Sequence, residues 1–329
     1  MRNIRVKICN TKLITGECET VMGKIGVIIN PNAKKFRTRK SSLKNYTSIN
    51  SDLLTIRVTE SADNISEIIH EFKKDKCSYI GVAGGDGTLH LAVTEMIKIY
   101  DSGKVPPLLI LREGTMDNVA RTINLNGKGP DLIRRLLWAI ENKKKIEIHR
   151  RNTIKIDNRY CFLFGTGIVA NFLNEVYNGK EKGLIRNIQV ALSAFAEGIR
   201  NEQNGRIFTW MDGKIYADNK EIKINPVNGI LAGTVEHIGM GFSPLINAVS
   251  DNKNFQLLIT AMAPLKLLKN LNRIRTGQTI EDEGYVNTSC RKLKLAYNSG
   301  FDYTMDGDMY RAEKELLVET GPAVKLIKV

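Results

Sequence analysis

Apolar positions in the first part of the chain follow two periods. Short β-prone runs indicate buried strands, and apolar residues that recur every three or four positions indicate amphipathic helices. The two patterns alternate four times, which predicts a parallel α/β sheet over residues 25–145. The strand-like runs are 24–30, 53–59, 79–82 and 107–111, and the helical stretches are 65–72, 89–100 and 132–140.

The pattern changes near residue 145. From 146 to 329, short alternating strands separated by Gly, Asn and Asp predict an all-β, sandwich-like second domain, with the last strand as a candidate to return to the first domain. Residues 1–24 form an N-terminal extension with one strand-like alternation. The predicted strands are 146–156, 160–164, 206–211, 221–224, 229–235, 255–261, 292–297, 303–305, 315–319 and 324–329, and the predicted helices are 169–177 and 184–200.

A glycine-rich turn joins the third strand of the first domain to its helix. The turn reads Gly84-Gly85-Asp86-Gly87-Thr88. Three glycines at a helix N-terminus bring bare backbone N–H groups to one point, which attracts anions such as phosphate. The Asp86 carboxylate would be repelled by a phosphate bound there unless a divalent cation lies between them. A tight structural connection is the alternative interpretation of a glycine-rich turn.

This string resembles the GGDGT signature of diacylglycerol and sphingoid-base lipid kinases, which NAD kinases and phosphofructokinases share in part. The resemblance implies a nucleotide-binding α/β domain that uses ATP and Mg²⁺. Asp86 would handle the metal, and Thr88 would cap the helix or donate to a phosphate. The ATP-binding residues expected from it are Asn30, Thr59, Gly84, Gly85, Asp86, Gly87, Thr88, Gly114, Thr115 and Asn118.

Two further segments support the resemblance. Residues 114–121 resemble the family's GTxNDxAR segment, with Asp117 and Asn118 in exchanged order. An Asp-Gly pair between strands usually forms a hairpin turn. Here Asp306-Gly307-Asp308 resembles the family's late Asp-Gly-Glu, which faces the glycine-rich turn across an interdomain cleft. The resemblance implies that Asp306 is the base for the lipid hydroxyl and that Asp308 and Asp86 manage metal and phosphate. Either Asp86 or Asp306 remains open as the proton acceptor.

Two positions depart from the family pattern. Residues 251–253 read Asp-Asn-Lys where the family carries an Asp-Asp-Gly loop for a structural magnesium, so that metal site stays open. His90 stands where the family often has an Asn-Glu pair. A single histidine on this helix favours a polar surface position or a supporting role next to the site.

Composition indicates the class of protein and its expected location. With 329 residues, 42% hydrophobic and 26% charged, the chain is typical of a soluble two-domain protein. No apolar run is long enough for a membrane span or a signal peptide, so we expect a cytoplasmic location. Five scattered cysteines without CxxC spacing argue against a disulfide framework or a zinc site.

The formal net charge is +14, with basic clusters at 34–40, 143–151 and 266–275. Each cluster alone is compatible with a solvated face. No nucleic-acid module accompanies them, so nucleic acid is not an expected partner. The basic amphipathic stretch 265–274 favours peripheral contact with an anionic membrane surface.

Three functions remain after these arguments. The leading one is a lipid kinase that transfers the γ-phosphoryl group of ATP to a hydroxyl of a diacylglycerol or a sphingoid or ceramide lipid. The second is an NAD kinase, and the third is a catalytically impaired relative that binds a nucleotide or a lipid. The sequence does not set the acceptor lipid or the oligomeric state, and a homodimer stays open.

Overall fold

The computed structural model describes residues 17–20, 22–38, 41–101, 103–114, 118–178, 193, 196–198, 200, 205–250 and 253–329. The expected strand in residues 4–8, Thr115, and the loop positions 251 and 252 lie outside these ranges. Of the expected helix 184–200, the described positions 193, 196–198 and 200 are helical.

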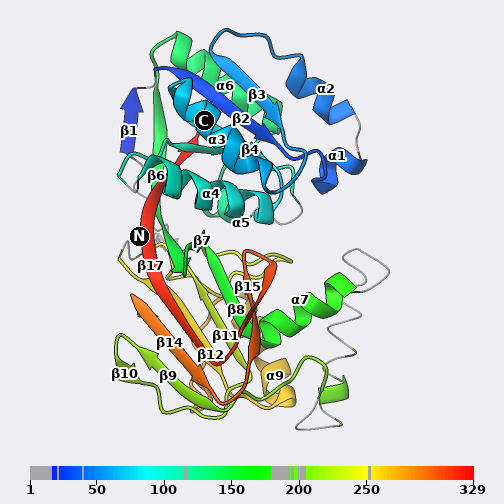
Figure 1. Cartoon of the computed structure of the whole chain (residues 1–329). Coiled ribbons are helices and arrows are strands. Elements are labelled where there is room, and N and C mark those ends of the chain that lie inside the picture. The colour runs from blue at the N-terminus through cyan, green and yellow to red at the C-terminus, as the bar shows by residue number, and fades with distance from the viewer. Residues whose placement is uncertain are drawn as a thin grey trace, which may run out of the picture.

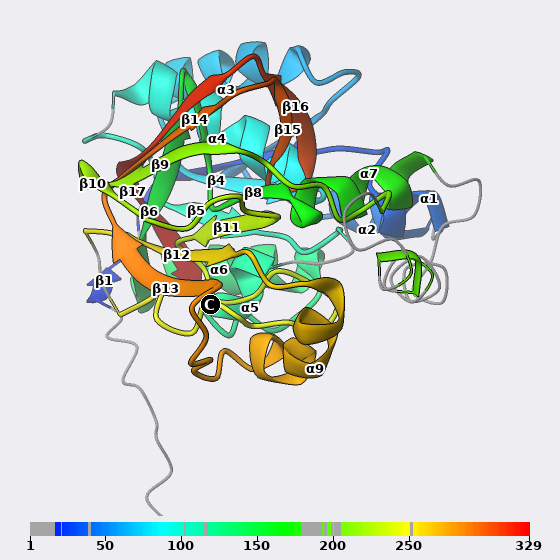
Figure 2. The same cartoon turned by 90° about the horizontal axis from the view of Figure 1, so that it is seen from below.

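The first half is a parallel sheet with helices on both faces, as the periodicity predicts (Figure 1). Its strands lie in the order β5-β4-β2-β3 and all run parallel. Helices α3 and α4 pack side by side on one face, and α6 lies on the opposite face (Figure 2). The bounds are β2 Lys24–Ile29, α1 Lys34–Thr38, α2 Ser41–Thr47, β3 Leu54–Val58, α3 Asn64–Lys74, β4 Cys77–Ala83, α4 Asp86–Tyr100, β5 Leu108–Ile110, α5 Asn118–Thr122 and α6 Gly129–Glu141.

Helix packing follows the apolar stripes of the sequence. On α3 the apolar positions 65, 68, 69 and 72 are all buried, and α6 buries its stripe in the same way behind a proline in its first turn. Gly26 on β2 lets the Phe72 ring lie against the sheet, because a Cβ there would come within 2.6 Å of the ring. Sheet and helices thereby share one hydrophobic core.

The second half is a β sandwich. One layer is a six-stranded sheet in the order β13-β12-β11-β8-β15-β16, and the other is the continuation of the first sheet through β17, β14, β9 and β10. Buried side chains of both layers form a second core. The bounds are β1 Glu17–Thr20, β6 Lys145–Ile156, β7 Arg159–Cys161, β8 Leu163–Gly167, α7 Ile168–Asn178, β9 Gly213–Ala217, β10 Lys220–Glu221, β11 Gly229–Gly233, β12 Phe255–Thr260, α9 Pro264–Arg275, β13 Tyr285–Cys290, β14 Lys292–Tyr297, β15 Phe301–Met305, β16 Asp308–Ala312 and β17 Glu315–Lys328.

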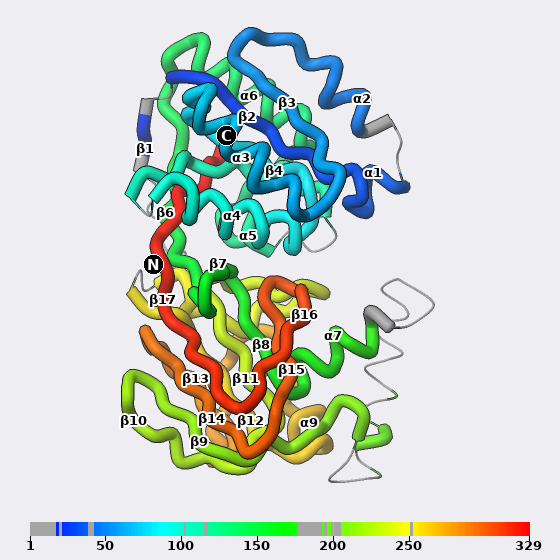
Figure 3. The backbone as a smooth tube through the Cα atoms, viewed as in Figure 1, coloured from blue at the N-terminus to red at the C-terminus, as the bar shows by residue number. Residues whose placement is uncertain are grey.

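The last strand connects the two halves. β17 pairs with β14 in the sandwich, continues along β6, and reaches β5 in parallel through the pair Leu326 and Leu108 (Figure 3). The register shifts between Thr320 and Ala323, where β17 passes from one half to the other. The two expected strands 315–319 and 324–329 are therefore one strand.

The expected fold class is confirmed, and the differences concern short elements. Segment 206–211 is not a strand and contributes one isolated bridge at Met211. Segment 160–164 is divided into β7 and β8. Strands β1, β9, β13 and β16 and helices α1, α2, α5 and α9 were not among the predicted elements. All of these except α9 are at most seven residues long, which is too short for a period to be distinguished. No described helix combines the length and the apolar composition that a membrane span requires.

Candidate active site

The predicted nucleotide residues follow the carboxyl ends of four adjacent strands. Asn30 follows β2, Thr59 follows β3, Gly84 follows β4 and Gly114 lies shortly after β5. The chain passes from β2 outward to β3 and then returns to β4 on the other side of β2. Ligands of open α/β sheets bind at such a reversal of strand order, outside the carboxyl ends.

One hydrogen bond spans this reversal. The Asn30 Nδ2 donates to the Thr88 Oγ1 at 2.8 Å, which joins the loop after β2 to the first turn of α4. The Asn30 Oδ1 accepts the backbone N–H of Asn32 at 2.9 Å. Thr59 is buried, and its N–H donates to the carbonyl oxygen of Ile29 at 2.8 Å. These bonds fix the loops after β2 and β3, on one side of the Gly84–Thr88 turn.

The turn itself requires small residues. A Cβ on Gly84 would lie 2.5 Å from the Thr88 Cβ, so only a glycine lets the backbone at this position lie so close to the threonine. Helix α4 begins at Asp86, and Gly85 holds the N-cap position in an extended conformation without a side-chain cap. The expectation that Thr88 caps the helix is therefore wrong. The first N–H groups of an α-helix have no acceptor within the helix.

The loop after β5 is held by groups that the sequence analysis did not identify. Glu113 has 6% of its surface exposed, and its Oε1 accepts the Tyr46 hydroxyl at 2.8 Å. The Lys35 N–H donates to the Glu113 carbonyl oxygen at 3.3 Å. Gly114 follows directly, and its Cα lies 3.9 Å from an ideal Cβ on Gly85. The loop thus lies against the glycine-rich turn.

Asn118 brings an amide to the same place. Its Nδ2 donates to the Asp86 Oδ2 at 3.3 Å. Its Oδ1 is buried and has no hydrogen-bond partner within the part of the chain that the structure describes. Carboxylate and amide oxygens are the kinds of ligand that Mg²⁺ prefers.

The second half contributes the Asp306–Asp308 segment through the β15–β16 hairpin. Met305 pairs with Asp308, so Asp306 and Gly307 form a two-residue turn, and both have positive φ as a type I′ turn requires. The Asp306 Oδ1 accepts the Leu163 N–H at 2.8 Å, and both carboxylate oxygens lie 3.1 Å from the Phe162 N. Asp306 therefore lies in a hairpin turn, and two backbone N–H groups also hold its carboxylate in place.

Asp308 meets the glycine-rich turn directly. A Cβ on Gly87 would lie 2.9 and 3.0 Å from the two carboxylate oxygens of Asp308. The missing side chain at Gly87 therefore allows this carboxylate to lie against the first turn of α4. A helix N-terminus carries partial positive charge, which favours a carboxylate there.

Two carboxylates, Asp86 and Asp308, act on a third, Asp306. Burial and the charge of Asp86 raise the pKa of Asp306 well above its usual range, against the two backbone N–H groups that favour its ionised form, and Asp308 adds to the rise. Burial also raises the pKa of Asp308. Negative charge is thus unfavourable here without a cation. Among the described residues, no group of three or more His, Cys, Asp or Glu side chains is arranged to hold a metal ion.

His90 is fully buried, so the surface expectation for it is wrong. Its Nδ1 contacts the carbonyl oxygen of Tyr160 at 2.8 Å, and its Nε2 lies 3.1 Å from the Tyr310 hydroxyl. Both partners belong to the second half of the chain. The spacing of three residues from Gly87 is the sequence signal that places it on the same face of α4.

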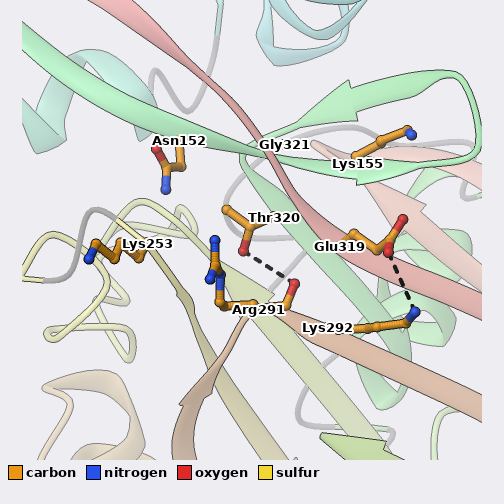
Figure 4. Close-up of a pocket in the computed structure, with 8 residues that line it drawn as sticks. All are labelled: Asn152, Lys155, Lys253, Arg291, Lys292, Glu319, Thr320 and Gly321. Carbon is orange, nitrogen blue, oxygen red and sulfur yellow. Dashed lines mark hydrogen bonds and ion pairs between the residues drawn. The ribbon is translucent and has the colours of Figure 1, made fainter. Parts of the chain in front are cut away.

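A pocket of about 520 Å³ lies elsewhere, where β17 crosses β6 beside the β13–β14 turn (Figure 4). None of the predicted site residues lines it. Its lining carries four cationic side chains, and the ion pair of Lys292 with Glu319 spans 3.7 Å. The lining residues are Asn152, Lys155, Lys253, Arg291, Lys292, Glu319, Thr320 and Gly321.

Comparison with known proteins adds the family. Residues 24–149 match the model of the diacylglycerol kinase catalytic domain. No curated protein matches the sequence. A solved diacylglycerol kinase of Bacillus anthracis str. Sterne is 16% identical, with a TM-score of 0.63 over 94% of this chain and 98% of the other. Two structures provisionally assigned as diacylglycerol kinases of the same strain are 17% and 18% identical, with TM-scores of 0.66 and 0.70 over 94% of this chain and 99% of each. Residues 24–149 therefore form a domain of the diacylglycerol kinase catalytic family, within a chain that has the two-domain fold of these bacterial proteins.

Proposed function

We propose that this protein is an ATP-dependent lipid kinase that transfers the γ-phosphoryl group to a hydroxyl of a diacylglycerol-type or sphingoid-type lipid. The contact of Asp308 with Gly87 carries the proposal, because it sets acidic groups of one half against a glycine-rich helix start of the other. Phosphoryl transfer needs a phosphate cradle and acidic groups at the same point. The matching catalytic-domain family supports the same reaction class.

The nucleotide would lie along the carboxyl ends of the parallel strands. Backbone N–H groups at Gly85, Asp86 and Gly87 would bind its phosphates at the start of α4. Asn30, Thr59 and Thr88 would line one side of the phosphates, and Gly114, Thr115 and Asn118 the other. The small residues at Gly85 and Gly114 would let the nucleotide approach the backbone.

Asp86 and Asn118 are the residues that would hold Mg²⁺. The metal would neutralise the charge of the transferring phosphates. The fit rests on the Asn118 Oδ1, which is buried without a partner in the described part of the chain, beside the Asp86 carboxylate. Mg²⁺ commonly takes one or two protein oxygens together with substrate phosphates. A set of three preformed protein ligands is therefore not required.

Asp306 would accept the proton of the lipid hydroxyl. Its Oδ1 is held by the N–H groups of Leu163 and Phe162, whereas Oδ2 shares only the N–H of Phe162, so Oδ2 is the oxygen that would take the proton. Burial and the charge of Asp86 raise the pKa of Asp306, so its ionised form is a stronger base than a free aspartate. Asp308 would orient the hydroxyl beside Gly87, and Asp86 is the alternative acceptor.

Helix α9 and the loop that meets its end would contact an anionic membrane surface. Leu265 and Met240 are large apolar side chains with 48% and 42% of their surface exposed. The Ser243 N–H donates to the Arg275 carbonyl oxygen at 2.8 Å, which places the loop of Met240 at the C-terminal end of α9. Basic side chains on this helix are Lys266, Lys269, Arg273 and Arg275.

The reaction is tested with purified protein, Mg²⁺ and γ-labelled ATP, offered diacylglycerol, sphingosine and ceramide in mixed micelles, and NAD in a parallel reaction. We expect label in a lipid phosphate. Label in NADP would contradict the lipid kinase and favour the NAD kinase. Bound ATP with no labelled product from any acceptor would favour the catalytically impaired relative.

The membrane proposal has a separate assay. Binding to vesicles should rise with the fraction of anionic lipid and fall with salt as the Debye length shortens from about 10 Å to about 3 Å. Leu265→Ser should weaken binding further without changing its slope with salt. Binding that does not depend on salt would contradict this proposal.

A further inference from the structure

His90 ties the helix that follows the glycine-rich turn to two strands of the sandwich. It lies on α4 one helical turn after Gly87. Its Nδ1 is 2.8 Å from the carbonyl oxygen of Tyr160 on β7, and its Nε2 is 3.1 Å from the hydroxyl of Tyr310 on β16. The Thr94 Oγ1, one turn further along α4, also contacts that carbonyl at 3.2 Å. One imidazole therefore bridges both halves next to the candidate active site.

The direction of both hydrogen bonds follows from the chemistry of the partners. A carbonyl oxygen can only accept, so the Nδ1 of His90 carries the ring proton. Burial lowers the pKa of His90 to about 4, so the ring is neutral near pH 7 and its Nε2 is an acceptor. The Tyr310 hydroxyl is then the donor. Burial and the charge of Asp308 raise the pKa of Tyr310, which keeps this proton in place.

Two contacts between α4 and β16 lie a few ångströms apart along each element. The Asp308 carboxylate lies against Gly87, and the Tyr310 hydroxyl lies against His90. Three residues on a helix span roughly 4.5 Å, and two residues on a strand span roughly 6.6 Å. Residues two apart on a strand share a face, so one face of β16 follows one face of α4. The Tyr310 contact therefore constrains the position of Asp308.

The Tyr310 ring is held from its faces as well. It stacks on Tyr303, its partner across the β15–β16 hairpin, with ring centroids 5.5 Å apart. The Arg159 guanidinium lies 4.9 Å from the ring centroid. Both contacts join Tyr310 to other parts of the second half. The hydrogen bond to His90 relates the ring itself to α4, in addition to the contact of Asp308 with Gly87.

We propose that His90 is a positioning residue that acts through the Tyr310 hydroxyl to hold the hairpin of Asp306 and Asp308 in register with the Gly84–Thr88 turn. The catalytic consequence rests on the proposed kinase function. The position of the hairpin relative to α4 can be measured without turnover. The positioning role of His90 and the kinase function can therefore be disproved independently.

Four variants test the proposal. Tyr310→Phe removes only the hydroxyl, and His90→Asn keeps a donor for the Tyr160 carbonyl but does not reach Tyr310. Each should lower kcat by about 10- to 100-fold and change the KM for ATP by less than about threefold, because the register shifts while the nucleotide loops stay. The double variant should lose no more than the poorer single variant. His90→Gln, whose Oε1 reaches Tyr310, should recover most of the loss.

Tyr297→Phe is the matched control, because the Tyr297 hydroxyl is buried in the sandwich without a hydrogen-bond partner among the described residues. It should keep wild-type kcat. Amide exchange of residues 301–312 should rise about 10-fold in His90→Asn and Tyr310→Phe, and stay unchanged in the control. Wild-type kcat in Tyr310→Phe, or losses that multiply in the double variant, would overturn the proposal. If the wild type phosphorylates no lipid, the proposed kinase function is wrong, and amide exchange alone then tests the positioning role of His90. Amide exchange at the wild-type rate in both variants would overturn that role.

Discussion

Gly87→Ala is the most informative single substitution, because the structure gives the displacement that it forces. The added Cβ would lie 2.9 and 3.0 Å from the carboxylate oxygens of Asp308. An ordinary contact between such atoms is about 3.5 Å. The carboxylate, or the hairpin that carries it, must therefore move by roughly half an ångström.

The size of the effect follows from this displacement. A misplacement of about 1 Å at a reacting group costs about 100-fold in rate, so half of it predicts a loss of about 10-fold in kcat. Stability should change little, because Ala in place of Gly favours a helix by up to about 1 kcal/mol and offsets the strain of the contact. Gly87→Ala should therefore lower activity while leaving stability nearly unchanged.

The assay is the initial rate of lipid phosphorylation, with thermal unfolding measured on the same preparations. Gly103→Ala is the control, because a Cβ at Gly103 meets nothing within 4 Å. It should keep wild-type kcat. Wild-type kcat in Gly87→Ala would refute the reasoning that Asp308 acts beside Gly87, and so would an equal loss in both variants.

Three further predictions follow from the same contacts. Asn118→Ala should weaken the Mg²⁺ dependence of ATP binding by about 10-fold in calorimetric titrations, because it removes the amide next to Asp86; unchanged titrations would contradict the metal assignment. The pKa of His90 falls from 6.5 to about 4 on folding, so the unfolded state binds more protons between these values and stability falls as the pH drops through them, by up to about 3 kcal/mol. In urea unfolding at pH 5 and 7, His90→Gln should lack this part of the pH dependence, and a wild-type dependence would argue against a buried neutral imidazole. The raised pKa of Asp306 acts with the opposite sign, since its contribution is lost as the pH rises above the ordinary aspartate value, so Asp306→Asn should gain stability relative to wild type between pH 4 and 7. A constant difference between the two proteins would show that Asp306 is not desolvated.

The periodicity predicts the sheet and the longer helices of the first half well, because α3 and α6 each carry an apolar stripe. The buried positions of α3 are those of the helical pattern, and β2 and β4 are buried at every position except Lys24 and Ser78. Strand β13 has no such pattern, since Asn287, Thr288 and Ser289 are exposed, and pairing with β12 stabilises it. The division of 160–164 into two strands arises at Phe162, whose N–H donates to Asp306 far along the chain.

The candidate site shows the same division between local and distant information. The glycine-rich turn is visible in the sequence because its residues are adjacent. The hydrogen-bond partners of His90 cannot be identified from the sequence, because Tyr160 and Tyr310 lie 70 and 220 residues away. A histidine on a helix is compatible with a surface position until the fold buries it. The hydrogen bond from Tyr46 to Glu113 joins residues 67 apart in the sequence, so it was not predicted for the same reason.

The central claim is that acidic groups of the β-rich half serve phosphoryl transfer at the glycine-rich turn of the α/β half. The most direct measurement is the transfer of label from γ-labelled ATP to diacylglycerol by wild type and by Asp306→Asn, with ATP binding measured on both. The account predicts labelled lipid phosphate from wild type, a loss of about 100-fold or more in the variant, and nearly unchanged ATP binding. Unchanged lipid turnover in the variant, with ATP binding lost, would contradict it.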